Sequence, residues 1–122
     1  MNFVHLLQDN IDKYGEYVFL NFEGQGYTNT DMQRLSNRLA HGLRKMGLQK
    51  DDRVAVFLPN MPEVCISQLA ILRAGGIVVP INPSLSPQEL SYIINHSEPF
   101  IIITSTDLAE TVRTAKELSS VK

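Results

Sequence analysis

Short, continuous apolar runs dominate the second half of the chain. They are rich in β-branched residues and cover residues 54–58, 77–81 and 100–104. Continuous apolar strands are typical of a sheet that is covered on both faces. Helical patterns lie between the runs, and strand–helix–strand order implies right-handed βαβ crossovers. The sequence therefore predicts an α/β fold in which helices flank a parallel sheet.

The helices of this half share one start signal, a capping residue that is followed three positions later by Glu. A capping side chain accepts a hydrogen bond from the first turn of the helix, and the Glu can accept one from the backbone of the capping residue. We therefore expect a helix to begin after each cap. The pairs are Asn60 with Glu63, Ser86 with Glu89, and Asp107 with Glu110.

The first half of the chain predicts a helix and a small β-hairpin. Apolar residues recur at helical spacing over residues 3–14, and Gly15 can end that helix. An alternating, β-rich segment at 17–23 is followed by the glycine-containing segment 24–26 and a short return at 27–28. Two β-rich segments around such a turn are typical of a hairpin.

A longer helix should follow the hairpin. Thr28 and Asp31 form a variant of the capping box, and Gly47 can end the helix. His41 lies off the apolar stripe and should face solvent. The stripe consists of Met32, Leu35, Leu39, Leu43 and Met46. A basic side, which we interpret as a solvated face, consists of Arg34, Arg38, Arg44 and Lys45.

The helix predicted at 63–74 differs from the others, because apolar residues surround it almost completely. An exposed helix normally keeps its apolar residues on one side. This helix therefore needs neighbouring elements on two sides. We expect three strands and their helices to be too few to provide them. We expect residues 1–122 to be the first part of a larger domain, with an exposed apolar patch on the isolated chain.

The composition excludes several classes of protein. A chain of 122 residues suffices for one domain or for one piece of a longer protein, and is too short for two. Apolar residues make up 43% and charged residues 20%, which excludes a disordered or fibrous chain. The formal charge of −2 is spread along the sequence, so we expect no nucleic-acid partner.

Two further features concern the cellular setting. No apolar run approaches the roughly 18 residues of a membrane-spanning helix, so we expect no transmembrane segment. The single cysteine, Cys65, can form no internal disulfide. A reduced, cytoplasmic setting follows most simply.

Two glycine patterns have the spacing of phosphate-binding loops but fail at defining positions. Gly24 and Gly26 stand where a dinucleotide-binding fingerprint would begin, but Asn29 replaces its third glycine. Segment 42–47 has the spacing of a Walker loop without the following Lys-Ser/Thr. It lies inside a helix pattern, where the backbone N–H groups are already bonded. We interpret the first pattern as a hairpin turn and the second as helix.

Side chains for metal binding or nucleophilic catalysis are not grouped in the sequence. His5, His41 and His96 are scattered and lack the spacing of ligands on one helix face. Cys65 lies in the most apolar helix, where a thiol is normally inert. We find no Gly-x-Ser-x-Gly elbow and no carboxylate pair suited to acid–base work.

The predicted architecture sets the best place for a ligand. In open α/β sheets, ligands bind beyond the carboxyl ends of the strands. Those ends are expected at residues 59–60, 82–83 and 104–106, where polar groups and constrained turns occur. Each of them is also an ordinary helix cap, and we favour this structural interpretation over ligand contact.

Several segments, taken in order, resemble the opening of the adenylate-forming enzymes. They are YTNTDM at 27–32, DRVAV at 52–56, LPNMPE at 58–63 and, most specifically, LRAGGIVVPINP at 72–83. The superfamily includes acyl-CoA synthetases, luciferases and the adenylation domains of peptide synthetases. Asn82 before Pro83 looks more like fatty-acyl-CoA synthetases, since peptide-synthetase domains more often have Asp there. Asp51 departs from the Gly of many relatives, but Asp also tolerates a left-handed turn.

The resemblance implies a two-step ligase. A fatty acid of medium or long chain would react with ATP to give an acyl-adenylate and pyrophosphate, and coenzyme A would then displace AMP. The implied cofactors are ATP, magnesium and coenzyme A. Such chemistry needs concentrated positive charge and N–H donors around the phosphates. The family supplies these from a phosphate loop with Lys, a Glu for magnesium, an Asp for the ribose and a Lys on a mobile C-terminal domain.

None of these family elements has a match between Met1 and Lys122. We therefore expect no catalytic, cofactor-binding or metal-binding residue in this chain, which should be inactive alone. Its main partner would be the rest of its own polypeptide. A homodimer and a peripheral position at a membrane stay open.

Two alternatives also remain. One is another adenylate-forming enzyme, either a luciferase-like oxidase or a carrier-loading adenylation domain. The other is a free-standing α/β binding module with no reaction of its own.

Overall fold

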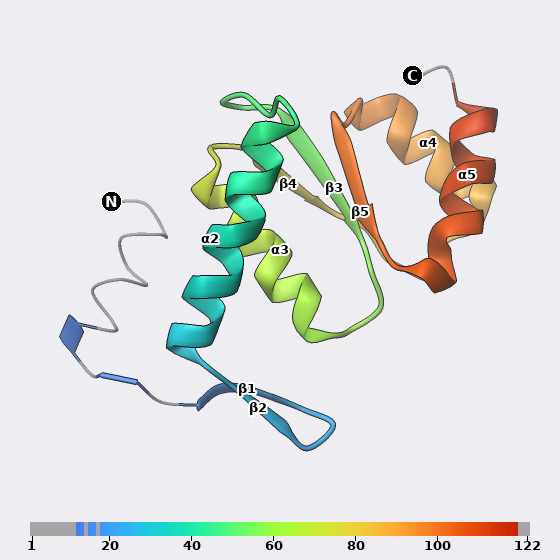
Figure 1. Ribbon diagram of the computed structural model, residues 1–122. Coiled ribbons are helices and arrows are strands. Elements are labelled where there is room, and N and C mark those ends of the chain that lie inside the picture. Colours follow the sequence, from blue (N-terminus) through green and yellow to red (C-terminus); the bar gives the residue numbers. More distant parts are fainter. Residues whose placement is uncertain (1–11, 14, 17, 120–122) are drawn as a thin grey trace.

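The computed structural model describes residues 12–13, 15–16 and 18–119. It confirms the predicted α/β fold, with a small hairpin ahead of a parallel sheet and its helices (Figure 1). The helix predicted at 3–14 lies outside the described residues, apart from Asp12 and Lys13. In chain order the elements are β1 (Val18–Phe22), β2 (Gln25–Thr28), α2 (Asn29–Lys45), β3 (Arg53–Phe57), α3 (Pro62–Arg73), β4 (Ile77–Pro80), α4 (Pro87–Ser97), β5 (Ile101–Thr104), the short 3₁₀-helix η1 (Thr106–Leu108) and α5 (Ala109–Leu118).

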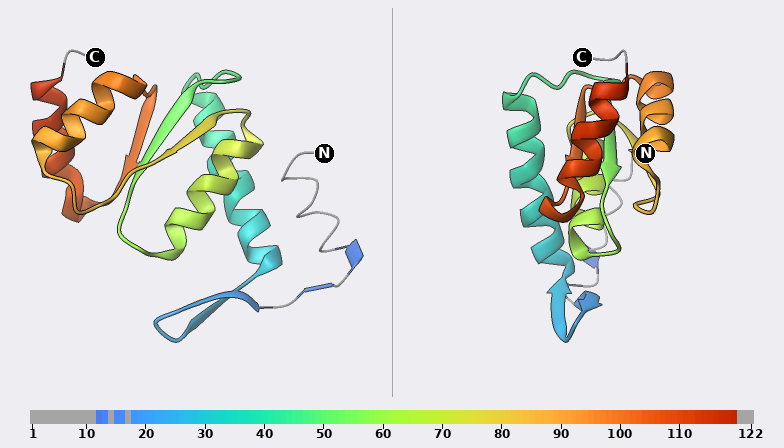
Figure 2. Two further views of the ribbon diagram at one scale, coloured as in Figure 1. Left: turned by 180° about the vertical axis from the view of Figure 1, so that it is seen from behind. Right: turned by 90° about the vertical axis from the view of Figure 1, so that its right-hand side faces the viewer.

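β3 is the central strand of the parallel sheet, with β4 on one side and β5 on the other. Val54 of β3 is level with Val78 of β4 and Ile101 of β5, so the three carboxyl ends lie at the same end of the sheet. Helices α2 and α3 cover one face, and α4 and α5 cover the other (Figures 1 and 2). Helices therefore join successive parallel strands, as the predicted crossovers require.

Each face of β3 contributes to a separate hydrophobic core, because side chains alternate along a strand. Val54 and Val56 pack against α2 and α3, whereas Ala55 and Phe57 pack against α4 and α5. All four side chains are buried, which explains why the run at 54–58 is continuously apolar. The buried helical residues are Ala40, Leu43, Ala70, Ile71 and Ala74 in the first core and Leu90, Ile94 and Ala115 in the second.

A two-residue turn joins β1 to β2. Phe22 pairs with Gln25, and the residues between them, Glu23 and Gly24, have positive φ angles of 50° and 82°. Two positive φ angles are typical of a type I′ turn, whose twist suits a hairpin. The predicted hairpin is confirmed, but its return strand begins at Gln25 rather than at Tyr27.

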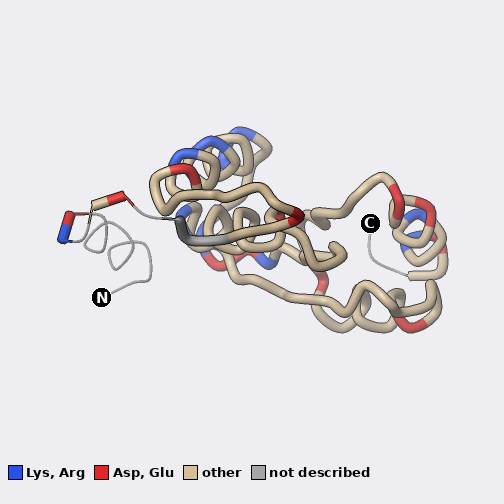
Figure 3. Tube along the Cα trace, turned by 90° about the horizontal axis from the view of Figure 1, so that it is seen from below, with Lys and Arg blue, Asp and Glu red and all other residues tan. Residues whose placement is uncertain are grey.

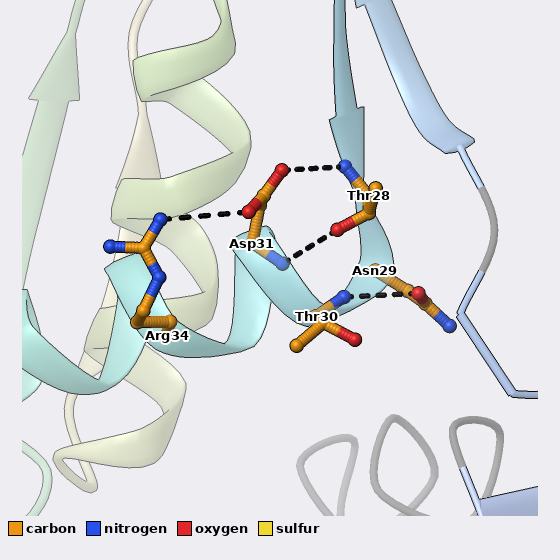
Figure 4. Close-up of polar contacts among 5 residues, drawn as sticks. All are labelled: Thr28, Asn29, Thr30, Asp31 and Arg34. Atoms are coloured by element: carbon orange, nitrogen blue, oxygen red, sulfur yellow. Dashed lines mark hydrogen bonds and ion pairs between the residues drawn. The ribbon is translucent and has the colours of Figure 1, made fainter.

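Helix α2 begins with the predicted capping box (Figure 4). The Thr28 hydroxyl accepts a hydrogen bond from the N–H of Asp31 at 3.0 Å, and the Asp31 carboxylate accepts one from the N–H of Thr28 at 3.1 Å. Asp31 also lies 3.5 Å from the guanidinium of Arg34. The bond from the Thr28 backbone lowers the pKa of the Asp31 carboxyl. These contacts give Asp31 a structural role at the start of the helix.

Asn29 connects the start of α2 to the segment before the hairpin. Its side chain is fully buried. The amide nitrogen donates to the carbonyl of Gly15 at 3.0 Å. The amide oxygen accepts from the N–H of Thr30 at 3.0 Å (Figure 4). A buried amide is stable only when it is hydrogen-bonded, so Asn29 fixes how the chain enters the helix.

The buried face of α2 differs from the predicted stripe. Leu35 and Leu39 are only half-buried, and Met46 is 65% exposed, so its predicted place in the core is wrong. The physical reason is that Met46 is the C-cap, after which the chain turns through Gly47 at a φ of 104°. Small residues take part of the buried face, which consists of Asn29, Met32, Ser36, Ala40 and Leu43.

Basic residues lie along the outer side of α2 (Figure 3). His41 is exposed on the same helix, as predicted. The predicted solvated face is confirmed, because every basic member is exposed: Arg34, Arg38, Arg44 and Lys45.

Only one of the three predicted caps after the first strand of the sheet is confirmed. Ser86 and Glu89 form a full capping box at the start of α4. Asn60 is not the cap of α3, because Pro62 occupies the first turn and the extended residue before it, Met61, becomes the N-cap. Asp107 lies within η1, which runs directly into α5, so the residue before that helix is already helical and the predicted cap is wrong.

Helix α3 packs between the sheet and α2. Leu69, Ala70 and Ile71 are buried there, whereas Leu72 near the end of the helix is 42% exposed. The helix is therefore not fully enclosed, as predicted for an apolar helix that lacks cover on one side. Among the described residues, no helix has the length and hydropathy of a membrane-spanning segment.

Candidate functional site

A pocket of about 370 Å³ lies at the carboxyl ends of β3 and β5. The sequence indicated the strand ends as the best place for a ligand, although we favoured helix caps there, and the structure places residues 104–106 on the pocket wall. Asn60 and Asn82, which end the other two strand segments, do not line it. The wall is formed by Leu39, Leu58, Met61, Glu63, Ile66, Ser67, Ile103, Thr104, Ser105 and Thr106.

A side-chain hydrogen bond fixes the floor of the pocket. The hydroxyl of Thr104 donates to the carbonyl of Phe57 at 2.9 Å, which joins the end of β5 to the end of β3. The next hydroxyl, that of Ser105, is buried without a hydrogen-bond partner among the described residues. A buried hydroxyl without a partner costs free energy, so a polar group entering beside Ser105 would find a free donor and acceptor.

The chemistry of the wall favours apolar groups. Half of the lining residues are apolar, namely Leu39, Leu58, Met61, Ile66 and Ile103, and the polar half consists of Glu63 and four residues with hydroxyls. Of the described residues that line the pocket, Glu63 is the only charged one, and none is Lys or Arg. Binding of a triphosphate needs positive charge or a set of free N–H groups. The residues present therefore do not fit MgATP.

Asn82 and Pro83, at the end of β4, form a turn instead of a pocket wall. The Asn82 side-chain oxygen accepts a hydrogen bond from the N–H of Ser84 at 2.9 Å, and its carbonyl accepts one from Leu85 at 3.3 Å. An Asn side chain that bonds the backbone two residues ahead is a common turn device. Asn82 is therefore a turn residue and not the helix cap that we expected at this strand end, and the turn leads directly into the Ser86 cap.

The remaining candidates are not brought together. His41 and His96 are exposed on different helices, and His96 stacks on Tyr92 with ring centroids 6.3 Å apart. Cys65 is half-buried beside Met32 and Leu69. In the part of the chain that the structure describes, no three His, Cys, Asp or Glu side chains form a group that could hold a metal.

Sequence reasoning missed the half of the pocket that comes from α2 and α3. Leu39, Met61 and Ile66 belong to apolar patterns that predict helices, and such patterns do not show which residues will be left facing a gap. The gap arises because α3 packs toward β3 and β4, while Ile103 of β5 is left half-buried. The connection from β3 through α3 to β4 was the one signal available, since it places α3 over these two strands and not over β5.

The chain matches known proteins over nearly all its length. Residues 7–122 match the model of the AMP-binding enzyme family. A long-chain-fatty-acid–CoA ligase of Bacillus subtilis (strain 168) is 39% identical over 99 residues, which cover 81% of this chain and 18% of the ligase. A linear gramicidin synthase of Brevibacillus parabrevis is 33% identical over 107 residues, which cover 88% of this chain and 2% of that protein.

A solved structure shares the fold. A benzoate CoA ligase from Burkholderia xenovorans LB400 aligns with a TM-score of 0.89 at 23% identity, over 96% of this chain and 24% of the ligase. The chain thus spans less than a quarter of either ligase. The family match agrees with the resemblance found in the sequence, and this chain belongs to the AMP-binding family of adenylate-forming enzymes.

Proposed function

We propose that the chain is the N-terminal part of the large domain of a fatty-acyl-CoA synthetase. The complete protein would convert a fatty acid, ATP and coenzyme A to acyl-CoA, AMP and pyrophosphate through an acyl-adenylate. The 39% identity to a long-chain-fatty-acid–CoA ligase is the observation that carries this proposal. The 122 residues would supply sheet and helix layers on which the catalytic segments are mounted.

The pocket supports a structural role for the isolated chain. Its described wall combines five apolar residues with hydroxyls and Glu63 and lacks a cation, so it is better suited to a side chain from the rest of the domain than to a nucleotide. The exposed side chains Leu72 and Ile77 are consistent with further cover from the same polypeptide. ATP, magnesium and coenzyme A would be held by residues outside this chain.

The complete gene product that contains this chain provides the test. With ATP, magnesium, coenzyme A and palmitate, we expect formation of palmitoyl-CoA and AMP, and chromatography measures both products. Acetate and benzoate serve as substrate controls. Turnover of benzoate but not of palmitate would contradict the fatty-acyl assignment, and no AMP with any of the three acids would count against the acyl-CoA synthetase itself.

A carrier-loading adenylation domain is the second candidate, because of the 33% identity to a linear gramicidin synthase. It would also release pyrophosphate, but it would pass the acyl group to a carrier-protein thiol. The same assay separates the two, since a carrier-loading enzyme would exchange pyrophosphate with ATP in the presence of an amino acid and would form no acyl-CoA.

A further inference from the structure

Positive charge is concentrated on helix α2. The helix contains four basic residues and one acidic residue, a net charge of +3 with His counted as neutral, whereas the whole chain carries −2. The other described α-helices are neutral or negative on the same count, since α3 has Glu63 and Arg73, α4 has Glu89, and α5 has two residues of each sign. The positive charge of α2 is therefore a local feature that the net charge of the chain conceals.

Most of this charge lies in a narrow row on the helix surface. An α-helix has 3.6 residues per turn, so residues spaced by four, three and four positions fall within an arc of roughly 60° over a length of about 16 Å. Four exposed residues of α2 have this spacing, and the row faces outward (Figure 3). We call them the basic stripe: Arg34, Arg38, His41 and Lys45.

Little in the described part of the chain neutralises the basic stripe. Arg34 lies 3.5 Å from the Asp31 carboxylate, but both side chains are exposed, and an exposed ion pair contributes little. Arg38 and Lys45 have no acidic partner among the described residues. Arg34 and Arg38 also stand four positions apart, a spacing at which like charges destabilise a helix. Helix stability therefore does not explain the stripe.

Two large apolar side chains are exposed where the basic stripe ends. Met46 directly follows Lys45 and is 65% exposed. Phe100 is 50% exposed, and its ring lies 3.6 Å from the position that a Cβ of Gly47 would take. Cations beside exposed apolar side chains are typical of proteins that bind a membrane surface. The cations meet anionic lipid headgroups there, and the apolar groups enter the boundary of the acyl chains.

We propose that the basic stripe, with Met46 and Phe100 at its end, binds the surface of a membrane that contains anionic lipids. A straight row of cations is complementary to a flat anionic surface. An acidic protein would also neutralise the cations, but it would give no reason for the exposed apolar pair. The proposal goes beyond the proposed function, because it holds whichever acid the complete protein activates.

Flotation of the complete gene product with lipid vesicles tests the proposal. We expect the protein to bind phosphatidylcholine vesicles that contain about 30% phosphatidylserine, and not to bind pure phosphatidylcholine. Salt at about 1 M shortens the Debye length to roughly 3 Å and should weaken the binding strongly. Equal binding to the two kinds of vesicle, or binding to neither, would overturn the proposal. Tighter binding to polyglutamate than to the anionic vesicles would assign the stripe to an acidic protein and would overturn it as well.

Charge-matched variants locate the binding surface. Arg38→Gln with Lys45→Gln removes two cations from the basic stripe, and Arg113→Gln with Lys116→Gln removes two exposed cations from α5. We expect the α2 variant to bind anionic vesicles about 30-fold more weakly, and the α5 variant to bind nearly as the unmodified protein does. Equal losses would show attraction through net charge alone and would contradict the stripe.

A second pair of variants tests the apolar contact. Met46→Gln removes the apolar group at the end of the stripe, and Leu118→Gln is the control, since Leu118 is 54% exposed at the end of α5. We expect a several-fold loss of affinity for anionic vesicles in Met46→Gln only, and equal affinities would refute insertion. Ligase activity is assayed on the same unmodified protein without vesicles. Vesicle binding without activity would refute only the proposed function, and activity without vesicle binding would refute only the membrane surface.

Discussion

The hydroxyl of Thr104 at the end of β5 donates a hydrogen bond of 2.9 Å to the carbonyl of Phe57 at the end of β3. The two residues are also a register pair, so the side-chain bond reinforces the last rung of the ladder. It fixes the distance between the two strand ends that frame the pocket.

Loss of that bond should be measurable. Thr104→Val keeps the shape of the side chain and removes the donor, so we expect the free energy of unfolding to fall by about 1 kcal/mol. Urea denaturation provides the measurement. Thr106→Val is the control, since Thr106 is exposed and should change stability by less than about 0.5 kcal/mol. Equal losses in the two variants would show that the bond to Phe57 contributes nothing.

The helix caps give a prediction that distinguishes a cap present in the structure from one that only the sequence pattern predicted. Ser86 accepts a hydrogen bond from the N–H of Glu89 at 3.2 Å, whereas Asn60 precedes the N-cap of its helix. We expect Ser86→Ala to lower the unfolding free energy by about 1 kcal/mol. Asn60→Ala should leave it nearly unchanged. If Asn60→Ala were as costly in urea denaturation, Asn60 would be a cap after all.

Two glycines of the same segment should respond to alanine in opposite directions. Gly47 has a φ of 104°, so Gly47→Ala imposes a strained backbone and should cost about 1 kcal/mol or more. Gly42 lies inside α2, and a Cβ there would meet nothing within 4 Å. Gly42→Ala should therefore stabilise the protein, by roughly 0.5–1 kcal/mol. Thermal unfolding of both variants checks the signs, and a gain in Gly47→Ala would contradict the left-handed turn.

Stability should fall in mild acid because two carboxyls at helix starts, those of Asp31 and Glu89, become protonated. Backbone hydrogen bonds from Thr28 and Ser86 lower the pKa values of Asp31 and Glu89 in the folded protein. As the pH falls, the unfolded chain therefore binds protons at these carboxyls before the folded chain does. The stability that the two carboxylates contribute above their unfolded pKa values is lost as the pH falls through their lower folded pKa values. We expect a steeper decline below about pH 4.5 for the unmodified chain than for the Asp31→Asn, Glu89→Gln double variant. Equal slopes in urea titrations between about pH 3 and pH 6, which bracket the usual carboxyl range of roughly 4, would refute the effect.

The sequence predicted the parallel sheet well, because strands buried on both faces leave a strong signal of continuous apolar residues. It predicted the caps at Thr28 and Ser86, where the residue before the helix is extended. It failed at Asn60 and Asp107, where a proline and a 3₁₀ turn move the start of the helix. The spacing of a capping residue and Glu alone does not show those shifts of one or two residues, although Pro62 is itself a sequence signal for the first turn of a helix.

The pocket was predicted only as a region. Thr104 and its neighbours follow from the strand ends, which the pattern locates. Leu39 and Met61 enter the wall through the packing of α2 and α3, and such packing depends on residues distant in the sequence. The exposure of Met46 was missed for a similar reason, since a helical stripe does not show where the last turn leaves the core.

The order of the strands has a consequence for biosynthesis. Within the parallel sheet, the central strand β3 is made first, and β4 and β5 follow it from the ribosome. Each later strand can therefore add to a free side of a strand that already exists, and none has to insert between two partners. The sheet can grow outward from its middle while translation continues, which shortens the time that the isoleucine run of β5 spends without a neighbour.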